Sequence, residues 1–354
     1  SRFPRLLFTL WGFTFQAFSH IMIKGSKGRF RLIINFEEIH NHMKFFLAPM
    51  QGLTGYIVRN AFHHHFDYID KYYTPFIPAA KRMNAKIKRD IDPVNNDGIT
   101  LIPQAMSIVA DEVIDLHRQL APYGYDEINV NLGCPSGTVV SKKRGSGILA
   151  YPDMLDSFLD ELYTKADFPV SIKTRVGFND DELWPKLIEI YSKYPISELT
   201  VHPRVQKDFY KNTPRMDDFD LAVQKINPDK TTLCYNGDIT DTGSFKALTD
   251  RFPDIDEIMV GRGLFANPAL IAELKGVHMD KAELRERLKN WHDEILSGYL
   301  SIFSGEKDAI FRMKEIWAYM HGLFPDSEKL WKKIKKCQTL NDYQSIVRMA
   351  FDAF

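Results

Sequence analysis

From Met43 onward, short apolar or β-branched runs alternate with longer amphipathic runs, and this alternation restricts the fold more than any other feature. Alternating strands and helices predict a parallel sheet, and eight such units predict a closed (β/α)₈ TIM barrel. An open doubly wound sheet usually has a glycine-rich loop after its first strand, whereas Pro49-Met50-Gln51-Gly52 stands here. The expected strands are Phe45–Pro49, Tyr68–Phe76, Thr100–Gln104, Glu127–Asn131, Pro169–Thr174, Glu198–His202, Thr231–Tyr235 and Glu257–Val260.

Helical patterns lie between these strands and continue after them. Asn179-Asp180-Asp181-Glu182 resembles a capping box in front of one of them. After about Lys275 the strand signals stop, so we expect a barrel over 43–275 and a small C-terminal all-helical domain over 276–354. The expected helices include Asp111–Ala121, Pro152–Lys165, Leu183–Tyr194, Lys281–Tyr299, Glu306–His321, Glu328–Lys336 and Asn341–Phe354.

Residues 1–42 differ in character from the rest, with six Lys/Arg against two Glu and an apolar, aromatic stretch over Leu6–Ile23. Such a stretch is compatible with a signal peptide, a transit peptide or an interfacial segment. Met43-Lys44-Phe45-Phe46, however, looks like a natural start directly before the first strand. We therefore interpret 1–42 as a non-native leader or a mis-called start and leave it out of the fold prediction.

Composition limits the partners. The formal net charge of the 354 residues is zero, so no global basic field attracts nucleic acid, and such a partner needs local patches. The spacing of Cys134, Cys234 and Cys337 suits neither a zinc site nor disulfides, which favours a reducing, cytoplasmic setting. Consecutive helical residues point about 100° apart, so His63-His64-His65 cannot share one ion. We expect a monomer with no metal and no membrane segment.

In a TIM barrel the functional groups lie at the carboxyl ends of the strands. Gln104 ends the third expected strand, and its amide can pair with a ring carbonyl and an imide N–H. Lys173-Thr174-Arg175 ends the fifth. A lysine in a barrel mouth is costly unless it meets an anion, and the N1–C2=O edge of a reduced flavin is negative. The alternative is a rim lysine that reaches solvent.

The last three strands end in further polar groups. His202 at the sixth can hydrogen-bond a ligand or cap a loop. Asn236-Gly237-Asp238 and Gly261-Arg262-Gly263 end the seventh and eighth strands, where TIM barrels recurrently bind phosphate. Gly261-x-Gly263-x-x-Ala266 also matches a loose dinucleotide fingerprint, which we reject because no further strand follows to carry a ribose-binding acid.

The fourth strand leads into Asn131-Leu132-Gly133-Cys134-Pro135, which predicts a cysteine held on a bent loop over the mouth. A thiol there can donate a proton to a developing carbanion, although a lone cysteine is more often a small hydrophobic residue. The basic, glycine-rich stretch that follows, Lys142-Lys143-Arg144, suits a lid that touches a phosphate backbone.

Taken together and in order, these motifs resemble the tRNA-dihydrouridine synthases over about Met43 to Lys275, with a helical tail of the expected kind. The set comprises Ala48-Pro49-Met50, Gln104, Asn131-x-Gly133-Cys134-Pro135, Lys173-x-Arg175, His202, Asn236-Gly237-Asp238 and Gly261-Arg262-Gly263. The resemblance implies FMN reduced by NADPH (or NADH), hydride transfer from flavin N5 to C6 of a tRNA uridine, and protonation of C5 by Cys134.

The resemblance also implies site residues. Asn131 and Arg175 would contact the target base, and the C-terminal helices would hold the tRNA, together with the basic loop of Lys142, Lys143 and Arg144. The residues expected at FMN, with His202 added from its position, are Pro49, Met50, Gln51, Gln104, Lys173, His202, Asn236, Gly237, Asp238, Gly261 and Arg262.

Two alternatives stay open at this point. Another FMN-dependent barrel enzyme, such as a dihydroorotate dehydrogenase, would use the same flavin site but needs neither the basic loop nor the helical tail. A non-catalytic RNA-binding factor would need no flavin, and a yellow purified protein would exclude it. The sequence does not say which uridine would be reduced.

Overall fold

The computed structural model describes residues 42–79 and 82–354. Apart from His42, the segment interpreted as a leader lies outside these described residues. The strands of the described part are all parallel and form one sheet. They are β1 (Lys44–Leu47), β2 (Lys71–Tyr73), β3 (Ile77–Pro78), β4 (Leu101–Ile102), β5 (Gln104–Met106), β6 (Ile128–Leu132), β7 (Val170–Gly177), β8 (Glu198–Val205), β9 (Thr232–Tyr235) and β10 (Glu257–Val260).

Two of the eight expected strands are each divided in two. Pro75 lies between β2 and β3, and Pro103 lies between β4 and β5. Proline has no backbone N–H to donate, so it interrupts a strand ladder. β2 pairs with β4, and β3 pairs with β5. The segments β2 and β3 therefore act together as one strand of an eight-membered ring, and β4 and β5 act together as the next. Because β1 pairs with both β2 and β10, the ring closes, and the predicted (β/α)₈ barrel is confirmed.

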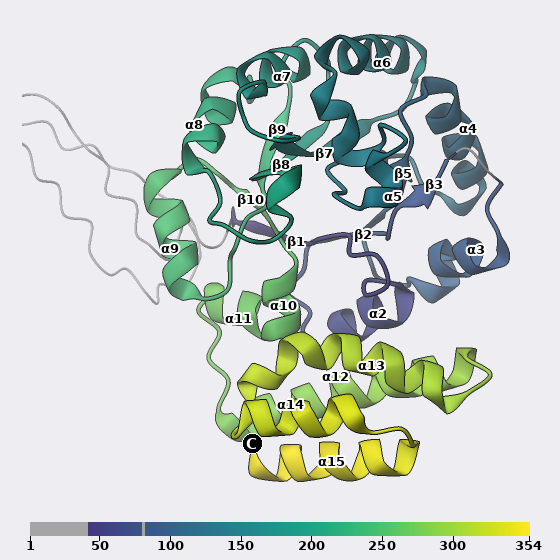
Figure 1. Ribbon diagram of the computed structural model, residues 1–354, viewed down its shortest axis with the longest axis vertical. Helices are drawn as coiled ribbons and strands as arrows, with labels where there is room; N and C mark the ends of the chain where they lie inside the picture. Colours follow the sequence, from purple (N-terminus) through teal and green to yellow (C-terminus); the bar gives the residue numbers. More distant parts are fainter. Residues whose placement is uncertain (1–41, 80–81) are drawn as a thin grey trace, which may run out of the picture. The chain divides into compact units, whose positions relative to one another are not determined.

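Helices surround this barrel (Figure 1). α6 has the predicted bounds, with Pro152 in its first turn. The capping box predicted before the seventh helix is wrong: α7 begins at Trp184 with Pro185 in its first turn, and no side chain caps it. The carboxylate of Asp181 pairs instead with Arg215. The helices are α2 (Tyr56–His65), α3 (Ala85–Ile91), α4 (Ala110–Leu120), α5 (Gly137–Val140), α6 (Pro152–Lys165), α7 (Trp184–Tyr191), α8 (Met216–Lys225), α9 (Thr242–Arg251), α10 (Arg262–Ala266) and α11 (Leu270–Leu274).

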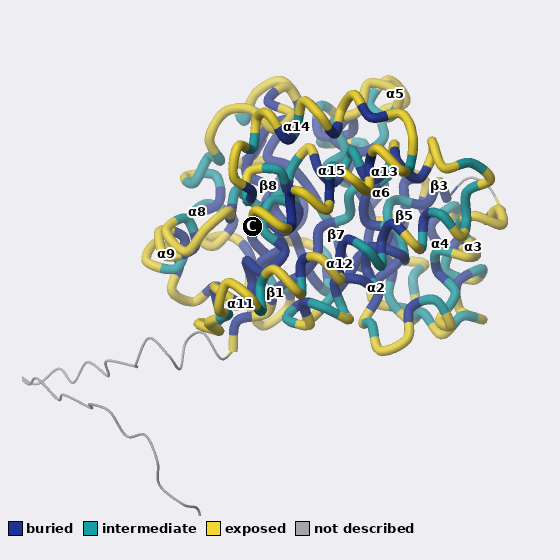
Figure 2. The backbone as a smooth tube through the Cα atoms, turned by 90° about the horizontal axis from the view of Figure 1, so that it is seen from below, coloured by how far each residue is buried: buried dark blue, intermediate teal, exposed yellow. Residues whose placement is uncertain are grey.

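The barrel is closed at one end and open at the other. Where the strands begin, Lys71 binds Glu198 at 2.8 Å, and the Tyr73 hydroxyl donates to the same carboxylate at 2.8 Å. These groups, of which Tyr73 and Glu198 are buried, fill the amino-terminal end, and the strands themselves form the most buried part of the molecule (Figure 2). The space for a ligand is therefore at the carboxyl ends of the strands.

The predicted helical tail is present as α12 (Lys281–Ile302), α13 (Glu306–Met320), α14 (Ser327–Lys336) and α15 (Leu340–Ala353). Together they pack beside α2 and α10 (Figure 1). His64 and His65 of α2 each bind a different oxygen of Glu294 at 2.8 Å, so these two histidines join the barrel to α12. Of the helices in the described residues, none has the length and apolar character that crossing a membrane requires.

Candidate active site

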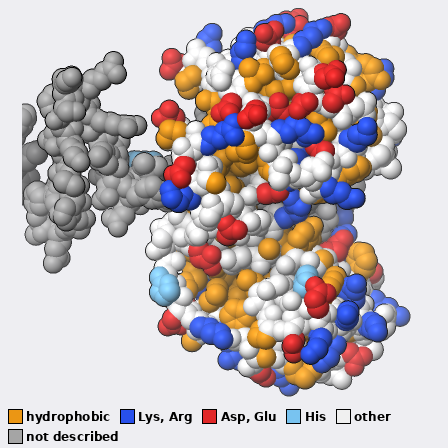
Figure 3. Space-filling model, turned by 60° about the vertical axis from the view of Figure 1, so that its left-hand side comes forward, with side chains coloured by type: hydrophobic (Ala, Val, Ile, Leu, Met, Phe, Trp, Pro, Cys, Tyr) orange, Lys and Arg blue, Asp and Glu red, His pale blue; other side chains and the backbone are white. Residues whose placement is uncertain are grey.

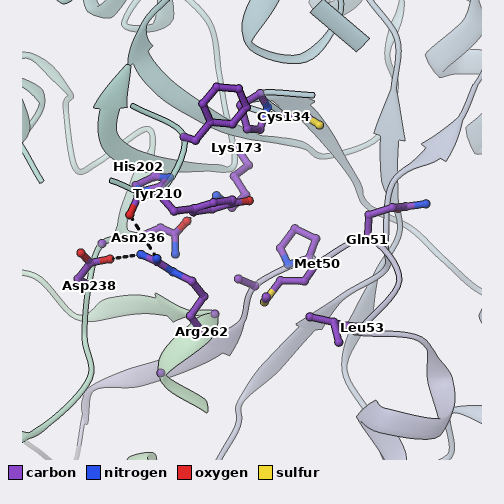
Figure 4. Close-up of a pocket in the computed structure, with 18 of the residues that line it drawn as sticks. Met50, Gln51, Leu53, Cys134, Lys173, His202, Tyr210, Asn236, Asp238 and Arg262 are labelled. Carbon is purple, nitrogen blue, oxygen red and sulfur yellow. Dashed lines mark hydrogen bonds and ion pairs between the residues drawn. The ribbon is translucent and has the colours of Figure 1, made fainter. Parts of the chain in front are cut away.

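A cavity of about 820 Å³ opens at the carboxyl ends of the strands. Its walls come from residues within β6, β7 and β8, from Phe76 before β3, and from the segments after β1, β6, β8, β9 and β10. Ala318 and Tyr319 of α13 complete them. Cys134, Lys173, Met50, Tyr210 and Arg262 surround one space, whereas the Gln51 side chain points away from it (Figure 4). The sequence-predicted residues among its lining are Pro49, Met50, Gln51, Asn131, Cys134, Lys173, Arg175, His202, Asn236, Gly237, Asp238, Gly261 and Arg262.

Gln104, the other residue predicted at the cofactor, does not line this cavity but is fully buried beneath it. Its amide nitrogen donates to Asn129 Oδ1 at 2.7 Å, and its oxygen accepts from Asn131 Nδ2 at 2.7 Å. Asn129 in turn donates to Ser171 Oγ at 3.1 Å. Buried amides that are all paired in this way have fixed orientations. Gln104 thus orients Asn131, which does reach the cavity.

Asn131 fixes the loop that carries the cysteine. Its side-chain oxygen accepts the backbone N–H groups of Gly133 at 3.1 Å and Cys134 at 2.8 Å. From the other side, Ser146 Oγ donates to the Cys134 carbonyl at 2.8 Å. Gly145 has φ +55°, and a Cβ there would lie 2.8 Å from the same carbonyl, so glycine is required for this close approach. Two segments therefore hold Cys134 at the cavity wall.

The thiol of Cys134 is protonated at neutral pH, as a general acid has to be. Burial raises the pKa of its thiol, while the Ser136 backbone, Arg175 and Lys173 lower it by less. An ordinary cysteine pKa is already about 8.5, so this thiol carries its proton at neutral pH. A protonated thiol facing a cavity can give a proton to a bound molecule.

Lys173 lies in the same wall and lacks a carboxylate partner among the described residues. Its Nζ donates to Asn236 Oδ1 at 2.5 Å, and Asn236 is held by its own bond to the Met259 carbonyl at 2.7 Å. Burial, and then the nearby Arg175, lower the pKa of Lys173 to about 7. An anionic ligand in the cavity would restore the charged form, so this lysine is a natural partner for one.

An ion-pair array lies at the ends of β8 to β10. The buried Arg204 donates to Asp238 Oδ1 at 2.9 Å. Arg262 donates to the same oxygen at 2.6 Å (Figure 4). His202 Nε2 lies 3.1 Å from Arg204 Nη1, and burial followed by Arg175 lowers the pKa of His202 well below its ordinary value. His202 is therefore neutral and accepts from Arg204 through Nε2.

Sequence reasoning missed several residues of this site. Arg204 follows His202 by two positions on β8, and this period-two spacing put it on the same face. Tyr210 lies in the irregular segment after β8, with its ring 4.9 Å from the Arg262 guanidinium. Tyr319 comes from α13, far along the chain, and no local sequence signal points to either tyrosine.

The predicted basic loop lies outside the cavity lining. Arg144 pairs with Glu112 at 3.1 Å, and Lys143 Nζ lies 4.4 Å from the Tyr151 ring centroid. Lys142 is exposed. If this loop contacts RNA, it therefore contacts a part of the RNA that stays outside the cavity.

We expect Asp238→Asn to destabilise the protein by about 1.5–3 kcal/mol, because the buried Arg204 loses a charge-assisted hydrogen bond. Burial raises the pKa of Asp238, but Arg204 and Arg262 outweigh it and hold the pKa below its ordinary value. The stabilisation is thus present at neutral pH and is lost as pH falls through that lowered pKa. Urea unfolding measures the effect, and the exposed Asp229→Asn, as a control, should change the free energy by under about 0.5 kcal/mol. Equal stability of both variants would contradict the ion-pair array.

Comparison with known proteins agrees with this geometry. A family model described as dihydrouridine synthase matches residues 46–352. A "Probable tRNA-dihydrouridine synthase" of Staphylococcus aureus (strain COL) is 27% identical over 286 residues, covering 77% of this chain and 81% of its own. The "tRNA-dihydrouridine synthase B" of Pasteurella multocida (strain Pm70) is 25% identical over 296 residues, covering 80% and 85%. The family model spans most of the described residues, and the chain therefore belongs to the dihydrouridine synthase family of enzymes.

Proposed function

We propose that this enzyme reduces a uridine of tRNA to 5,6-dihydrouridine, with FMN as its cofactor and NADPH as the reductant. One observation carries the proposal: a protonated thiol, Cys134, and a lysine with no carboxylate partner in 42–79 and 82–354, Lys173, face one cavity at the open end of the barrel. The family match and the names of the two relatives support the same reaction and substrate.

The residues present fit FMN. The cavity volume of about 820 Å³ falls in the range of small-ligand sites. Lys173 would meet the N1–C2=O edge of the flavin ring, which is negative when the flavin is reduced. Arg262, with Gly237 and Gly261, would meet the phosphate where TIM barrels commonly bind one. A side chain at Gly237 would overlap the Tyr235 hydroxyl, at 2.0 Å from its Cβ, so the chain is closely packed there.

The uracil ring would be held by hydrogen-bond donors that have no acceptor among the residues that the structure describes. Arg175 has five N–H groups, and three donate to the carbonyls of Gly133, Val205 and Phe209 at 2.8–3.0 Å. One N–H on each terminal nitrogen remains. Asn131 donates one N–H to Gln104 and has a second to spare. These donors suit the carbonyl oxygens of a uracil.

The chemistry divides between cofactor and protein. When bound, reduced FMN supplies a hydride to C6 of the uracil. The negative charge that this addition leaves on the base spreads over C5 and the C4 carbonyl, and it needs an acid. Cys134 gives its proton to C5, and the raised pKa of its thiol keeps that proton in place until it is needed.

RNA binding must come from local clusters, because charges of both signs are interspersed on the face shown in Figure 3. The exposed Lys142 and Lys143 form one such cluster, and Lys332, Lys333, Lys335 and Lys336 of α14 form another. We therefore expect the logarithm of the tRNA affinity to fall linearly with the logarithm of the salt concentration. An affinity that does not change with salt would favour a small substrate, as in the dihydroorotate dehydrogenase alternative.

The test of the reaction itself is nucleoside analysis. Purified tRNA from cells that lack the protein is incubated with the enzyme, FMN and NADPH, then digested and analysed for dihydrouridine. We expect one uridine position to be converted. A yellow protein that oxidises NADPH but leaves all tRNA uridines intact would overturn the proposal.

A further inference from the structure

The segment 206–215 between β8 and α8, here called the aromatic loop, stands at the rim of the cavity. Phe209 and Tyr210 both line the cavity, yet 47% and 53% of their surfaces are exposed. Lys207 and Lys211, on either side, are exposed as well. The loop thus presents two aromatic rings and two cations to whatever approaches the mouth.

Three arginines from three different strand ends hold the backbone of this loop. Arg175 donates to the Phe209 carbonyl at 2.8 Å and Arg262 to the Tyr210 carbonyl at 3.3 Å. Arg204 donates to the Lys211 carbonyl at 3.0 Å. Because charged donors from the rigid barrel fix three successive carbonyls, the loop is preorganised and would lose little entropy when it binds a partner.

Inside the loop, Asp208 completes the support. Its carboxylate accepts the Val205 N–H at 3.2 Å and the Asn212 side-chain amide at 2.6 Å, and it also pairs with Arg215. The loop is therefore held from within as well as from the barrel.

Phe209 has a backbone conformation that disfavours a large side chain. Its φ of +52° lies in the left-handed region, where glycine is comfortable and a bulky residue is strained. Core packing does not account for the phenylalanine, because 47% of its surface is exposed. A strained residue that a surrounding network holds in place is typical of functional positions.

The two rings have different surroundings. The Tyr210 ring lies 4.9 Å from the Arg262 guanidinium, 5.6 Å from that of Arg175, and 6.5 Å from the His202 ring. Among the described residues, no aromatic ring or cation stacks on Phe209 in this way. Phe209 therefore has a ring face available to a partner, and Tyr210 does not have the same freedom.

We propose that Phe209 is a wedge that fills the gap in the RNA base stack when the target uridine leaves the stack and enters the cavity. This inference rests on the proposed function. An enzyme that acts on a stacked base must extrude it, and apolar side chains inserted between base steps stabilise such distortions. An aromatic ring can stack on the neighbouring bases whatever their identity, and Lys207 and Lys211 are placed to meet the flanking phosphates.

The test uses a matched pair of variants that both lack the ring. Phe209→Ala keeps the unfavourable φ, whereas Phe209→Gly relieves it, so the glycine variant should have the higher melting temperature of the two. We expect both to lower kcat/KM on folded tRNA by about 5- to 150-fold, the effect of losing one base–aromatic stack. Phe209→Trp should stay within a few-fold of wild type, and all should keep the flavin absorbance.

A second substrate separates wedging from other roles. It is a short, unstructured oligoribonucleotide that carries the same uridine and its neighbours. No stack has to be opened there, so the wild type and both small variants should react at rates within about two-fold of one another.

Three results would overturn these ideas, each in a different way. Full tRNA turnover by Phe209→Gly would show that the ring is not needed. An equal loss on tRNA and on the oligoribonucleotide would place Phe209 in contact with the reacting base instead of the stack. If the wild type reduced no uridine in either RNA, the proposed function itself would be wrong, and the wedge with it.

Discussion

We expect Cys134→Ala to slow re-oxidation of the reduced flavin by tRNA by about 10²–10⁴-fold, the usual contribution of a general acid. The variant should still bind FMN, and NADPH should still reduce it at nearly the normal rate, because that half-reaction puts no proton on C5. Stopped-flow absorbance of the flavin measures the two half-reactions separately. The wild-type rate should hold as pH rises and then fall as the thiol ionises, above the pH at which an ordinary cysteine does, because burial raises the pKa of Cys134.

The control for this experiment is Cys337→Ala. Cys337 is buried, whereas Cys134 is half-buried, and it follows the end of α14, where its thiol donates to the Ile334 carbonyl at 3.0 Å. Both half-reactions of the control should match the wild type. Unchanged tRNA turnover in Cys134→Ala would make Cys134 a structural residue. Loss of FMN from that variant would place the cysteine at the cofactor, and the acid would then have to be sought elsewhere at the cavity mouth, because His202 is neutral there.

The second large effect is expected for Lys173→Met, which should weaken FMN binding but stabilise the flavin-free protein. At pH 7 and below, FMN affinity should fall about 10- to 150-fold, because the flavin loses a charged hydrogen-bond donor. In the wild type, affinity should decline as pH rises above about 7, the pKa of Lys173 without ligand, since binding must then take up a proton. The Met variant should lack this pH dependence. Fluorescence titration with FMN measures both.

The flavin-free Lys173→Met protein should, in contrast, be more stable than the wild type. The folded-state pKa of Lys173, about 7, lies below its ordinary value of 10.5, so the folded state binds fewer protons between these values. The free energy of unfolding of the wild type should therefore increase as pH rises from about 7 toward 10.5. Over that range, the difference in the free energy of unfolding between the wild type and Lys173→Met should become smaller. Lys142→Met, outside the cavity, should change neither property. A Lys173→Met protein that keeps full FMN affinity would contradict the role of this lysine.

The sequence determined the architecture and the location of the site at the carboxyl ends of the strands. Periodicity alone predicted eight βα units, because buried parallel strands and amphipathic helices leave different spacings of apolar residues. In a parallel barrel every strand ends at the same edge, so residues at or just after the ends of the expected strands, such as Cys134, Lys173 and Asp238, had to meet. Pro152 fixed the start of α6 for a local reason, its lack of an N–H, and that helix has the predicted bounds.

Only the tertiary structure decided what each side chain touches. Gln104 lies under the cavity because the buried amides of Asn129 and Asn131 pair with it, and this contact runs between the side chains of two paired strands. The hydrogen bonds from Arg175, Arg204 and Arg262 to the aromatic loop, and the approach of Tyr319 from the tail, are likewise contacts that no local period in the sequence predicts. Periodicity indicates which face of a helix or strand is buried. Which residues pack against that face depends on how elements from different parts of the chain come together. Hydrogen bonds between such elements then decide how the polar side chains are oriented.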